Sequence, residues 1–270
     1  MEQDIAQMRK ALIKRARKQV QERYSERDVH IIRAVSVLGD LDNAFNLLAE
    51  DCIEWYGAHF PEMNSLVRDN DAFLRIVREI GDKKEISEKN VSKALGVEGK
   101  ERAKAVEEKA KSSMGSAVPA RALKEMQLLA SNALVLKEER KELQAFIEEE
   151  MQKLAPNFSR LAGEVLGARL LASAGGLKQL AIKPGSTMQL LGAEKALFRH
   201  LKNRNSKGPK YGFIYGHPIV KKALPKNKGK MARTLASKLV LAARADYFGS
   251  KRDVAKEMLA CLEKRAKELE

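Results

Sequence analysis

Apolar residues recur at intervals of three and four along most of the chain, which is the spacing of one helix face. Residues 1–57 follow this pattern, with an apolar face at Ile31, Val35, Leu38, Leu41, Phe45 and Leu48. A further helix is expected over 65–80, because Gly81 follows it. No alternating apolar and polar run extends beyond a few residues, although YGFIYG (211–216) could form a short extended stretch. The pattern therefore predicts an all-α fold.

The stretch 86–155 predicts a long antiparallel coiled-coil hairpin. Its second arm repeats apolar residues in alternating steps of three and four, interrupted at Arg140 and Glu150, between flanks rich in Glu and Lys. These apolar residues are Met126, Leu129, Ala133, Leu136, Leu143, Ile147 and Leu154. The first arm has a weaker seam of Val91, Leu95, Ala103, Val106, Ala110 and Met114, and Gly115 and Pro119 mark the turn. Two ordinary core helices fit the same pattern, but length and charge favour a protruding arm that serves dimerisation.

The composition is that of a folded protein without a membrane segment. Of its 270 residues, 44% are apolar and 32% are charged. No run of 18 apolar residues occurs, and the first residues carry charges where a secretion signal needs an apolar core. Cys52 and Cys261 lie far apart and match no metal-binding spacing, so we expect two reduced thiols in a cytosolic protein.

The positive charge is concentrated in one fifth of the chain. The net charge is +15, and the segment from Arg199 to Arg252 contains fifteen Lys and Arg but only one acidic residue, Asp246. Charge focused in this way is typical of a surface that binds a polyanion, and nucleic acid is the leading candidate.

The segment 186–202 predicts an amphipathic helix with a cationic ridge. Ser186 and Gln189 have the spacing of a capping box. An apolar face of Leu190, Ala193, Leu197 and Leu201 is expected to pack inward. Lys195, Arg199 and Lys202 follow at i, i+4 and i+7, a ridge of about 10 Å that matches consecutive phosphates. Gly192 in mid-helix permits the close approach of another backbone, and Glu194 either orients a cation, accepts from a base edge or a 2′-hydroxyl, or forms a surface ion pair.

A second basic helix is expected within 226–248. Met231, Leu235, Leu239 and Ala242 form its inward face, whereas Lys230, Arg233 and Arg244 lie within about 60° of one another on the helical wheel, with Lys238 to one side. Together with the basic loop 202–210, the two helices predict one positive surface. The candidate RNA-binding residues are Gly192, Ala193, Glu194, Lys195, Arg199, His200, Lys202, Arg204, Lys226, Asn227, Lys228, Lys230, Arg233, Lys238 and Arg244.

The sequence gives no support for catalysis. The four histidines, His30, His59, His200 and His217, form no HxxxH motif, and no acidic cluster, nucleophile–base pair, GxGxxG motif or P-loop is present. His200 and His217 are more typical of packing or of stacking on RNA. We therefore expect no enzyme activity, no metal site and no cofactor.

Several segments resemble the Nop-domain family. They are GAEKALFRHLK (192–202) preceded by STMQLL, PKYGFIYGHPIV (209–220), KNKGKMARTLASKLVLAARADYF (226–248), LAPNFSRLAGEVLGARLLASAGGL (154–177), EWYGAHFPEM (54–63) and SSMGSA (112–117). The resemblance runs from about residue 25 to 250 and is specific, because several rare words occur in the same order. It is most similar to the archaeal Nop scaffold of box C/D guide ribonucleoproteins.

The resemblance implies a non-catalytic scaffold. Family members bind a guide RNA that already holds a kink-turn-binding protein of the ribosomal L7 type, self-associate through the coiled coil, and recruit fibrillarin, which methylates ribose 2′-hydroxyls. Gly192–Lys195, Arg199 and Lys202 would then lie at the junction of RNA and kink-turn protein, and Lys226–Arg233 beside an RNA stem. Localisation would be cytoplasmic in an archaeon and nucleolar in a eukaryote.

The expected organisation has four segments: an N-terminal and central helical segment at 1–85, the hairpin at 86–155, a compact Nop domain that binds RNA and protein at 156–250, and a C-terminal helix at 251–270. Family members carry an α/β domain that docks fibrillarin before the central helices. Only about 25 residues precede the match here, so we expect most of that domain to be missing.

Two other functions remain open from the residues alone. The chain could be a basic helical protein that binds RNA or DNA without a methyltransferase partner. It could also be a structural coiled-coil protein whose basic end confers solubility. The first predicts binding to RNA without the kink-turn protein, and the second predicts dimerisation without nucleic-acid affinity at physiological salt.

Overall fold

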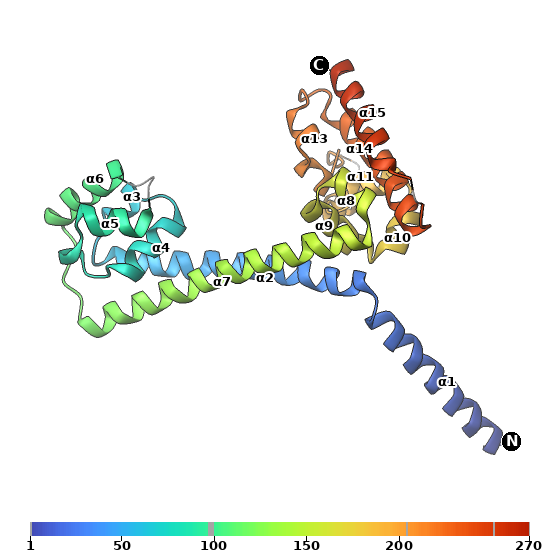
Figure 1. Cartoon of the computed structure of the whole chain (residues 1–270), viewed down its shortest axis with the longest axis horizontal. Coiled ribbons are helices and arrows are strands. Elements are labelled where there is room, and N and C mark those ends of the chain that lie inside the picture. Colours follow the sequence, from blue (N-terminus) through green and yellow to red (C-terminus); the bar gives the residue numbers. More distant parts are fainter. Residues whose placement is uncertain (1, 97–99, 204, 251, 270) are drawn as a thin grey trace. The chain divides into compact units, whose positions relative to one another are not determined.

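The structure is a computed structural model that describes residues 2–96, 100–203, 205–250 and 252–269. These residues form helices and no strand, so the all-α prediction is confirmed (Figure 1). They divide into two compact units: one runs from Leu38 to Leu143, and the other combines the residues before Leu38 with Gln144 and beyond. Among the described residues, no helix has the length and apolarity needed to cross a membrane.

The N-terminal residues are helical as predicted and form two helices. The first, α1, spans Glu2–Tyr24, and α2 spans Arg27–Gly57. The start of α2 is fixed by Asp28, which is buried and pairs with Arg23 Nη1 at 2.8 Å. The second carboxylate oxygen of Asp28 accepts a hydrogen bond from the backbone N–H of Leu177 at 3.2 Å. This carboxylate therefore joins the start of α2 to the start of a later helix.

In the unit from Leu38 to Leu143, short helices form a cluster at one end of two long ones. The short helices are α3 (Met63–Leu66), α4 (Asn70–Glu79), the 3₁₀ helix η1 (Lys83–Glu85), α5 (Glu88–Leu95) and α6 (Lys100–Lys111). The long ones are α2 and α7 (Ala120–Leu154). Tyr56 is fully buried in their shared core, where its ring meets Phe73 edge-on and its hydroxyl donates to Gly81 O at 2.6 Å.

The partner of α7 is α2, so the hairpin expected over 86–155 is wrong in its first arm. Within this unit, Lys137 Nζ lies 5.5 Å from the centre of the Phe45 ring, and Arg140 pairs with Asp42. The residues of the expected first arm form α5 and α6 instead, which pack against α3, α4 and η1. The physical reason is Gly96, whose φ of 77° ends α5 and leaves only short helices with a few small buried residues.

The two interruptions of the α7 seam are explained by ion pairs with α2. Arg140 pairs with Asp42, and Glu150 Oε2 lies 3.3 Å from Arg27 Nη1. A charged residue at a seam position is tolerated where the facing helix supplies its counter-charge.

SSMGSA joins α6 to α7, and it is not the turn between two coiled-coil arms expected over 86–155. This non-helical segment lies against the turn that follows α2, where Ser116 N donates to Ala58 O at 3.0 Å and Met114 N donates to Glu62 Oε1 at 3.0 Å. Gly115 is required there, because a Cβ atom would lie 2.1 Å from the carbonyl oxygen of His59.

The other unit is built around α14 (Lys228–Tyr247). Its apolar face is buried as the sequence predicts, including Met231, Leu235, Leu239 and Ala242. Around it lie α8 (Pro156–Ala162), α9 (Glu164–Ala174), α10 (Leu177–Ile182), α11 (Gly185–Leu190), α12 (Glu194–Lys202), α13 (Pro218–Lys222) and α15 (Val254–Glu268). YGFIYG contains the 3₁₀ helix η3 (Phe213–Gly216), so the extended stretch suggested for it is wrong. Backbone N–H groups at the start of this turn donate hydrogen bonds to carbonyl groups of α11 and the residue after it, and these bonds fix the turn beside α11.

Candidate nucleic-acid interface

The helix expected from Ser186 through Lys202 is broken at Gly192. The first piece, α11, begins at Gly185 without a side-chain cap, and α12 begins at Glu194. Gly192 has φ of 87°, a left-handed conformation that favours glycine. A Cβ atom on Gly192 would lie 2.5 Å from the Phe213 ring, so the ring of η3 also requires a glycine here.

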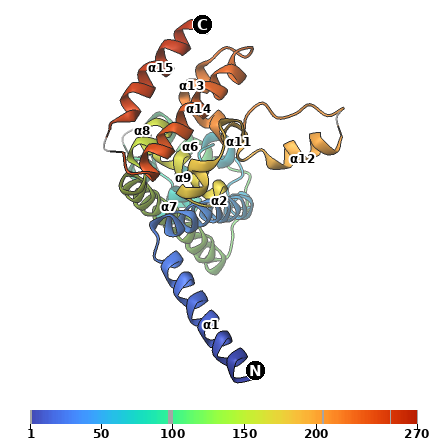
Figure 2. The same cartoon turned by 90° about the vertical axis from the view of Figure 1, so that its right-hand side faces the viewer.

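The segment that contains α12 is clamped at its base. Gly212 N donates to Gln189 O at 2.9 Å, and Phe213 N donates to Leu191 O at 2.7 Å. We call residues 193–203 and 205–209 the α12 arm. These two bonds lie at its base, where the chain enters the arm and where it leaves it. Figure 2 shows α12 and the loop after it extending away from α11, α13 and α14. Arg204, one of the predicted site residues, lies outside the described residues.

No residue of α12 is buried. Phe198 is 67% exposed and Leu201 is 62% exposed, so the prediction that Leu201 packs inward is wrong. The cause is the break at Gly192, because the apolar spacing of α11 does not continue into a helix that starts again with a new direction. The structure thus leaves an apolar surface on the α12 arm.

The cationic ridge lies on one face of α12. Lys195, Arg199 and Lys202 are all exposed, and among the described residues none of the three has an acidic partner. Their spacing of four and three places them on adjacent turns of one helix. Three unpaired cations at this spacing form a surface that attracts a phosphate backbone.

Glu194 anchors the α12 arm instead of pairing with a cation. Its Oε1 accepts hydrogen bonds from Gly192 N at 2.8 Å and from Ser173 Oγ at 3.1 Å. Burial acts to raise the pKa of Glu194, but the hydrogen bonds from Gly192 N, its own N–H and Ser173 outweigh it, so the pKa lies below the usual value. The carboxylate is therefore ionised at neutral pH and holds α12 against α9.

His200 and Ala193, two further candidate residues of the α12 arm, make contacts within the chain. His200 Nδ1 is hydrogen-bonded to the carbonyl of Ser206, which turns the loop back after α12. Ala193 N donates to Leu190 O at 2.9 Å and precedes the first residue of α12.

The second basic segment lines an open groove of about 670 Å³. Lys226, Lys230 and Arg233 contribute from α14 and the loop before it. Two further cations that are not among the candidate residues line this groove, Lys210 and Arg265, and Arg265 also pairs with Glu268 at 2.7 Å. Lys210 lies in the predicted basic loop, whereas Arg265 belongs to α15, whose packing beside α14 leaves no signal in the local sequence.

Lys228 belongs to an aromatic cluster next to this groove. Its Nζ lies 3.2 Å from Tyr215 Oη and 4.9 Å from the centre of that ring. The Tyr215 ring stacks on Tyr211, with centroids 4.8 Å apart. The contact fixes the first turn of α14 against η3.

Three predicted residues lie differently from the rest. Asn227 is buried, and its Nδ2 donates to Leu269 O at 2.6 Å. Arg244 donates from Nε to Ala181 O at 2.9 Å, at the end of α10. Lys238 is half-buried and lines neither groove of the α12–α14 region. The side chains of Asn227 and Arg244 therefore hold the unit together.

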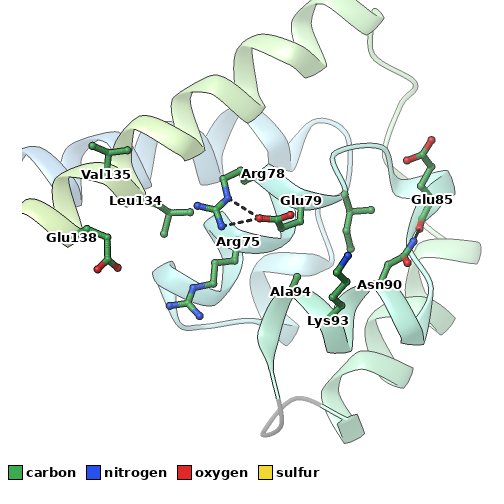
Figure 3. A pocket seen from close by; sticks show the side chains of 11 residues that line it. Arg75, Arg78, Glu79, Glu85, Asn90, Lys93, Ala94, Leu134, Val135 and Glu138 are labelled. Carbon is green, nitrogen blue, oxygen red and sulfur yellow. Dashed lines mark hydrogen bonds and ion pairs between the residues drawn. The ribbon is translucent and has the colours of Figure 1, made fainter.

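A groove of about 570 Å³ in the other unit has a different character (Figure 3). Arg75, Arg78 and Lys93 face it together with Glu79, Glu85 and Glu138, and Arg78 pairs with Glu79 at 2.7 Å. Because acids balance its cations, this groove lacks the focused positive charge of the α12 arm. The described residues also contain no group of three His, Cys, Asp or Glu side chains placed to hold a metal ion.

The family model for Nop, with the description "snoRNA binding domain, fibrillarin", matches residues 37–268. The chain belongs to the Nop family. It is 42% identical over 240 residues to nucleolar protein 58 of Candida albicans, covering 89% of this chain and 45% of that protein. It is 41% identical over 246 residues to an uncharacterised NOP5 family protein of Methanocaldococcus jannaschii, covering 90% of this chain and 58% of that protein.

The fold of this Nop-family chain is also found in a solved structure. The crystal structure of a fibrillarin/Nop5p complex matches with a TM-score of 0.56 and 22% identity, covering 97% of this chain and 78% of that one. The chain spans about half the length of the curated relatives that it matches.

Proposed function

We propose that the chain is a non-catalytic scaffold of a box C/D guide ribonucleoprotein. It binds the guide RNA together with a kink-turn-binding protein of the L7 type and supports fibrillarin-dependent 2′-O-methylation. Membership of the Nop family supports this proposal, as do relatives named nucleolar protein 58 and NOP5 family protein. The compartment follows the organism, cytoplasm in an archaeon and nucleolus in a eukaryote.

The observation that carries the proposal is the pair of exposed faces on α12. Lys195, Arg199 and Lys202 form a cationic face, and Phe198 and Leu201 form an apolar edge beside it. Large apolar side chains exposed together mark a protein contact, whereas unpaired cations mark a phosphate contact. A joint surface of RNA and a small protein contacts both faces at once, because the phosphates bind the cations and the protein covers the apolar edge. Neither partner alone makes both contacts.

The groove at the start of α14 supplies the second RNA contact. Lys226, Lys230 and Arg233 line this groove together with Lys210 and Arg265, and in this proposal they bind phosphates of an RNA stem. Ser186, Gln189 and Thr234 line the groove as well, and such side chains commonly bond to phosphate and sugar oxygens. These contacts position the stem without reading its sequence.

Self-association is assigned to α2 and α7 within the unit from Leu38 to Leu143. Leu47, Leu128 and Val135 are exposed there at 60%, 56% and 62%. Analytical ultracentrifugation of L128E/V135E tests this assignment. We expect the variant to have a lower mass in solution than the wild-type chain. Fibrillarin binding rests on the relatives alone and is tested by adding fibrillarin to the assembled particle.

The charge-reversal variant K195E/R199E tests the proposal. It is expected to abolish assembly on box C/D RNA bearing the kink-turn protein while the helical circular dichroism is retained. K104E/K109E makes the same change in net charge at two exposed lysines of α6 and is expected to assemble normally. Equal assembly by both variants would contradict the proposal.

A further inference from the structure

A second open groove, of about 740 Å³, lies between α9 and the α12 arm. Arg169, Ala172 and Ser173 line it from α9, at the i, i+3 and i+4 spacing of one helix face. Lys195, Ala196 and Arg199 line it from α12, and Phe213 contributes an aromatic ring. The volume is within the range of pockets that hold small ligands.

Arg169 adds a cation that the sequence prediction did not include. Its side chain is exposed, and among the described residues it has no hydrogen-bond or ion-pair partner. Lys195 and Arg199 also have no partner within the described part of the chain, so three unpaired cations of that part line the groove. An arginine guanidinium binds two phosphate oxygens at once, which makes Arg169 the strongest single phosphate ligand that α9 offers.

The aromatic ring and the small residues favour a planar group over a duplex. Phe213 is 38% exposed and packs over Gly192, so its ring is held in a fixed orientation in the groove. Ala172, Gly192 and Ala196 leave space beside it. A base can stack on an aromatic side chain only when it is unstacked from its neighbours, as in loops and bulges of RNA.

We propose that this groove binds one unpaired nucleotide of the RNA, with its phosphate on Arg169 and Arg199 and its base against Phe213. The proposal rests on the RNA-scaffold function and names a further contact of that function. Glu194, fixed by Ser173 and Gly192, borders the groove and accepts a hydrogen bond from a ribose hydroxyl or a base amino group.

The test uses the full chain assembled with the kink-turn protein on a box C/D guide RNA, probed by 2′-hydroxyl acylation at each nucleotide. R169A removes the phosphate ligand, and A196L fills the groove from an exposed helical position without changing a charge. K178A on α10 is the matched control, because Lys178 is exposed, lies outside the groove and has no partner among the residues that the structure describes. R169K retains the positive charge.

We expect R169A and A196L to expose the same unpaired nucleotide and to weaken assembly about tenfold, whereas K178A matches wild type and R169K is intermediate. Wild-type footprints and affinity for both R169A and A196L would overturn the proposal. Weaker assembly with an unchanged footprint would assign the groove to an acidic side chain of the kink-turn protein, which also overturns it. Failure of the wild-type chain to bind this RNA would instead contradict the scaffold function itself.

Discussion

The ring of Phe213 packs against the backbone of Gly192. A Cβ atom at Gly192 would lie 2.5 Å from that ring, and the φ of 87° is one that residues with a side chain rarely adopt. The contact fixes the point where α11 ends and the α12 arm begins, so the direction of the arm depends on a glycine and an aromatic ring 21 positions apart.

Replacing Gly192 with alanine is expected to loosen the base of the α12 arm. The left-handed backbone alone costs about 1–2 kcal/mol once a Cβ is present, and Phe213 must also move. The hydrogen bonds from Gly212 N and Phe213 N across this base should therefore open more often. We expect amide hydrogen exchange at Gly212 and Phe213 to accelerate about tenfold or more, since about 1.4 kcal/mol corresponds to a factor of ten. G216A is the control, because a Cβ at Gly216 meets no atom within 4 Å, and equal exchange in both variants would contradict the prediction.

Asp246 is predicted to be essential for stability although it is the one acid in the basic segment. Its carboxylate accepts three hydrogen bonds, from Asn157 N, Asn157 Nδ2 and Phe158 N, at 3.2, 2.8 and 2.8 Å. D246A leaves these donors unpaired, and we expect the free energy of unfolding to fall by about 2–3 kcal/mol. Urea denaturation measures this change. D246N retains one acceptor oxygen and should lose less, so an equal loss in the two variants would show that the hydrogen bonds do not carry the effect.

The stability of the unit should decrease as the pH falls through 6.5 because of His217. Burial lowers the pKa of His217 below its ordinary value of 6.5, and the hydrogen bond with Leu161 O opposes this shift without overcoming it. The unfolded chain therefore binds more protons than the folded chain below pH 6.5, so the free energy of unfolding decreases as the pH falls through that value.

H217N tests the pH dependence. Asparagine is a good cap for α13, whose first turn His217 now caps through Ile219 N, but it does not titrate. We expect a shallower pH dependence for H217N than for wild type in thermal unfolding followed by circular dichroism. Parallel curves for the two proteins around pH 6.5 would rule out His217 as the titrating group.

Gly39 offers a stabilising substitution within α2. A Cβ atom there meets nothing within 4 Å, and the residue is exposed in a helix interior. G39A is expected to raise the free energy of unfolding by about 0.5–1 kcal/mol, because alanine loses less backbone entropy on folding. A decrease in the urea midpoint would show that Gly39 is required by a contact outside the chain or by a local bend.

The helical fold was predictable because the periodicity of buried positions is local. The inward face of α14 is an example, since its four predicted apolar residues are all buried. The pairing of helices was not predictable, because the seam of α7 fits any apolar partner, and α2 rather than 91–114 supplies it. The charges of Arg140 and Glu150 in the seam could have indicated the correct partner, because each requires an opposite charge on the facing helix and α2 supplies both.

The sequence predicts the positive charge of the candidate site, but it does not predict the break at Gly192 or the grooves that the charged side chains line. Lys195, Arg199 and Lys202 share a face because four residues make about one turn. The break at Gly192 depends on Phe213, which lies 21 residues further along, so the exposure of Leu201 had no local signal. Arg169 lines one basic groove and Arg265 lines the other. Tertiary packing places both there, and the spacing of residues within a single helix does not reveal it.

The most direct test of the joint surface on α12 is the affinity of the chain for box C/D RNA, measured with and without the bound kink-turn protein. We expect the bound kink-turn protein to strengthen binding of the chain at least tenfold. F198S/L201S should lose most of this gain while it keeps its weak affinity for RNA alone. Equal affinity of the wild-type chain for naked RNA and for the RNA–protein complex would contradict the account.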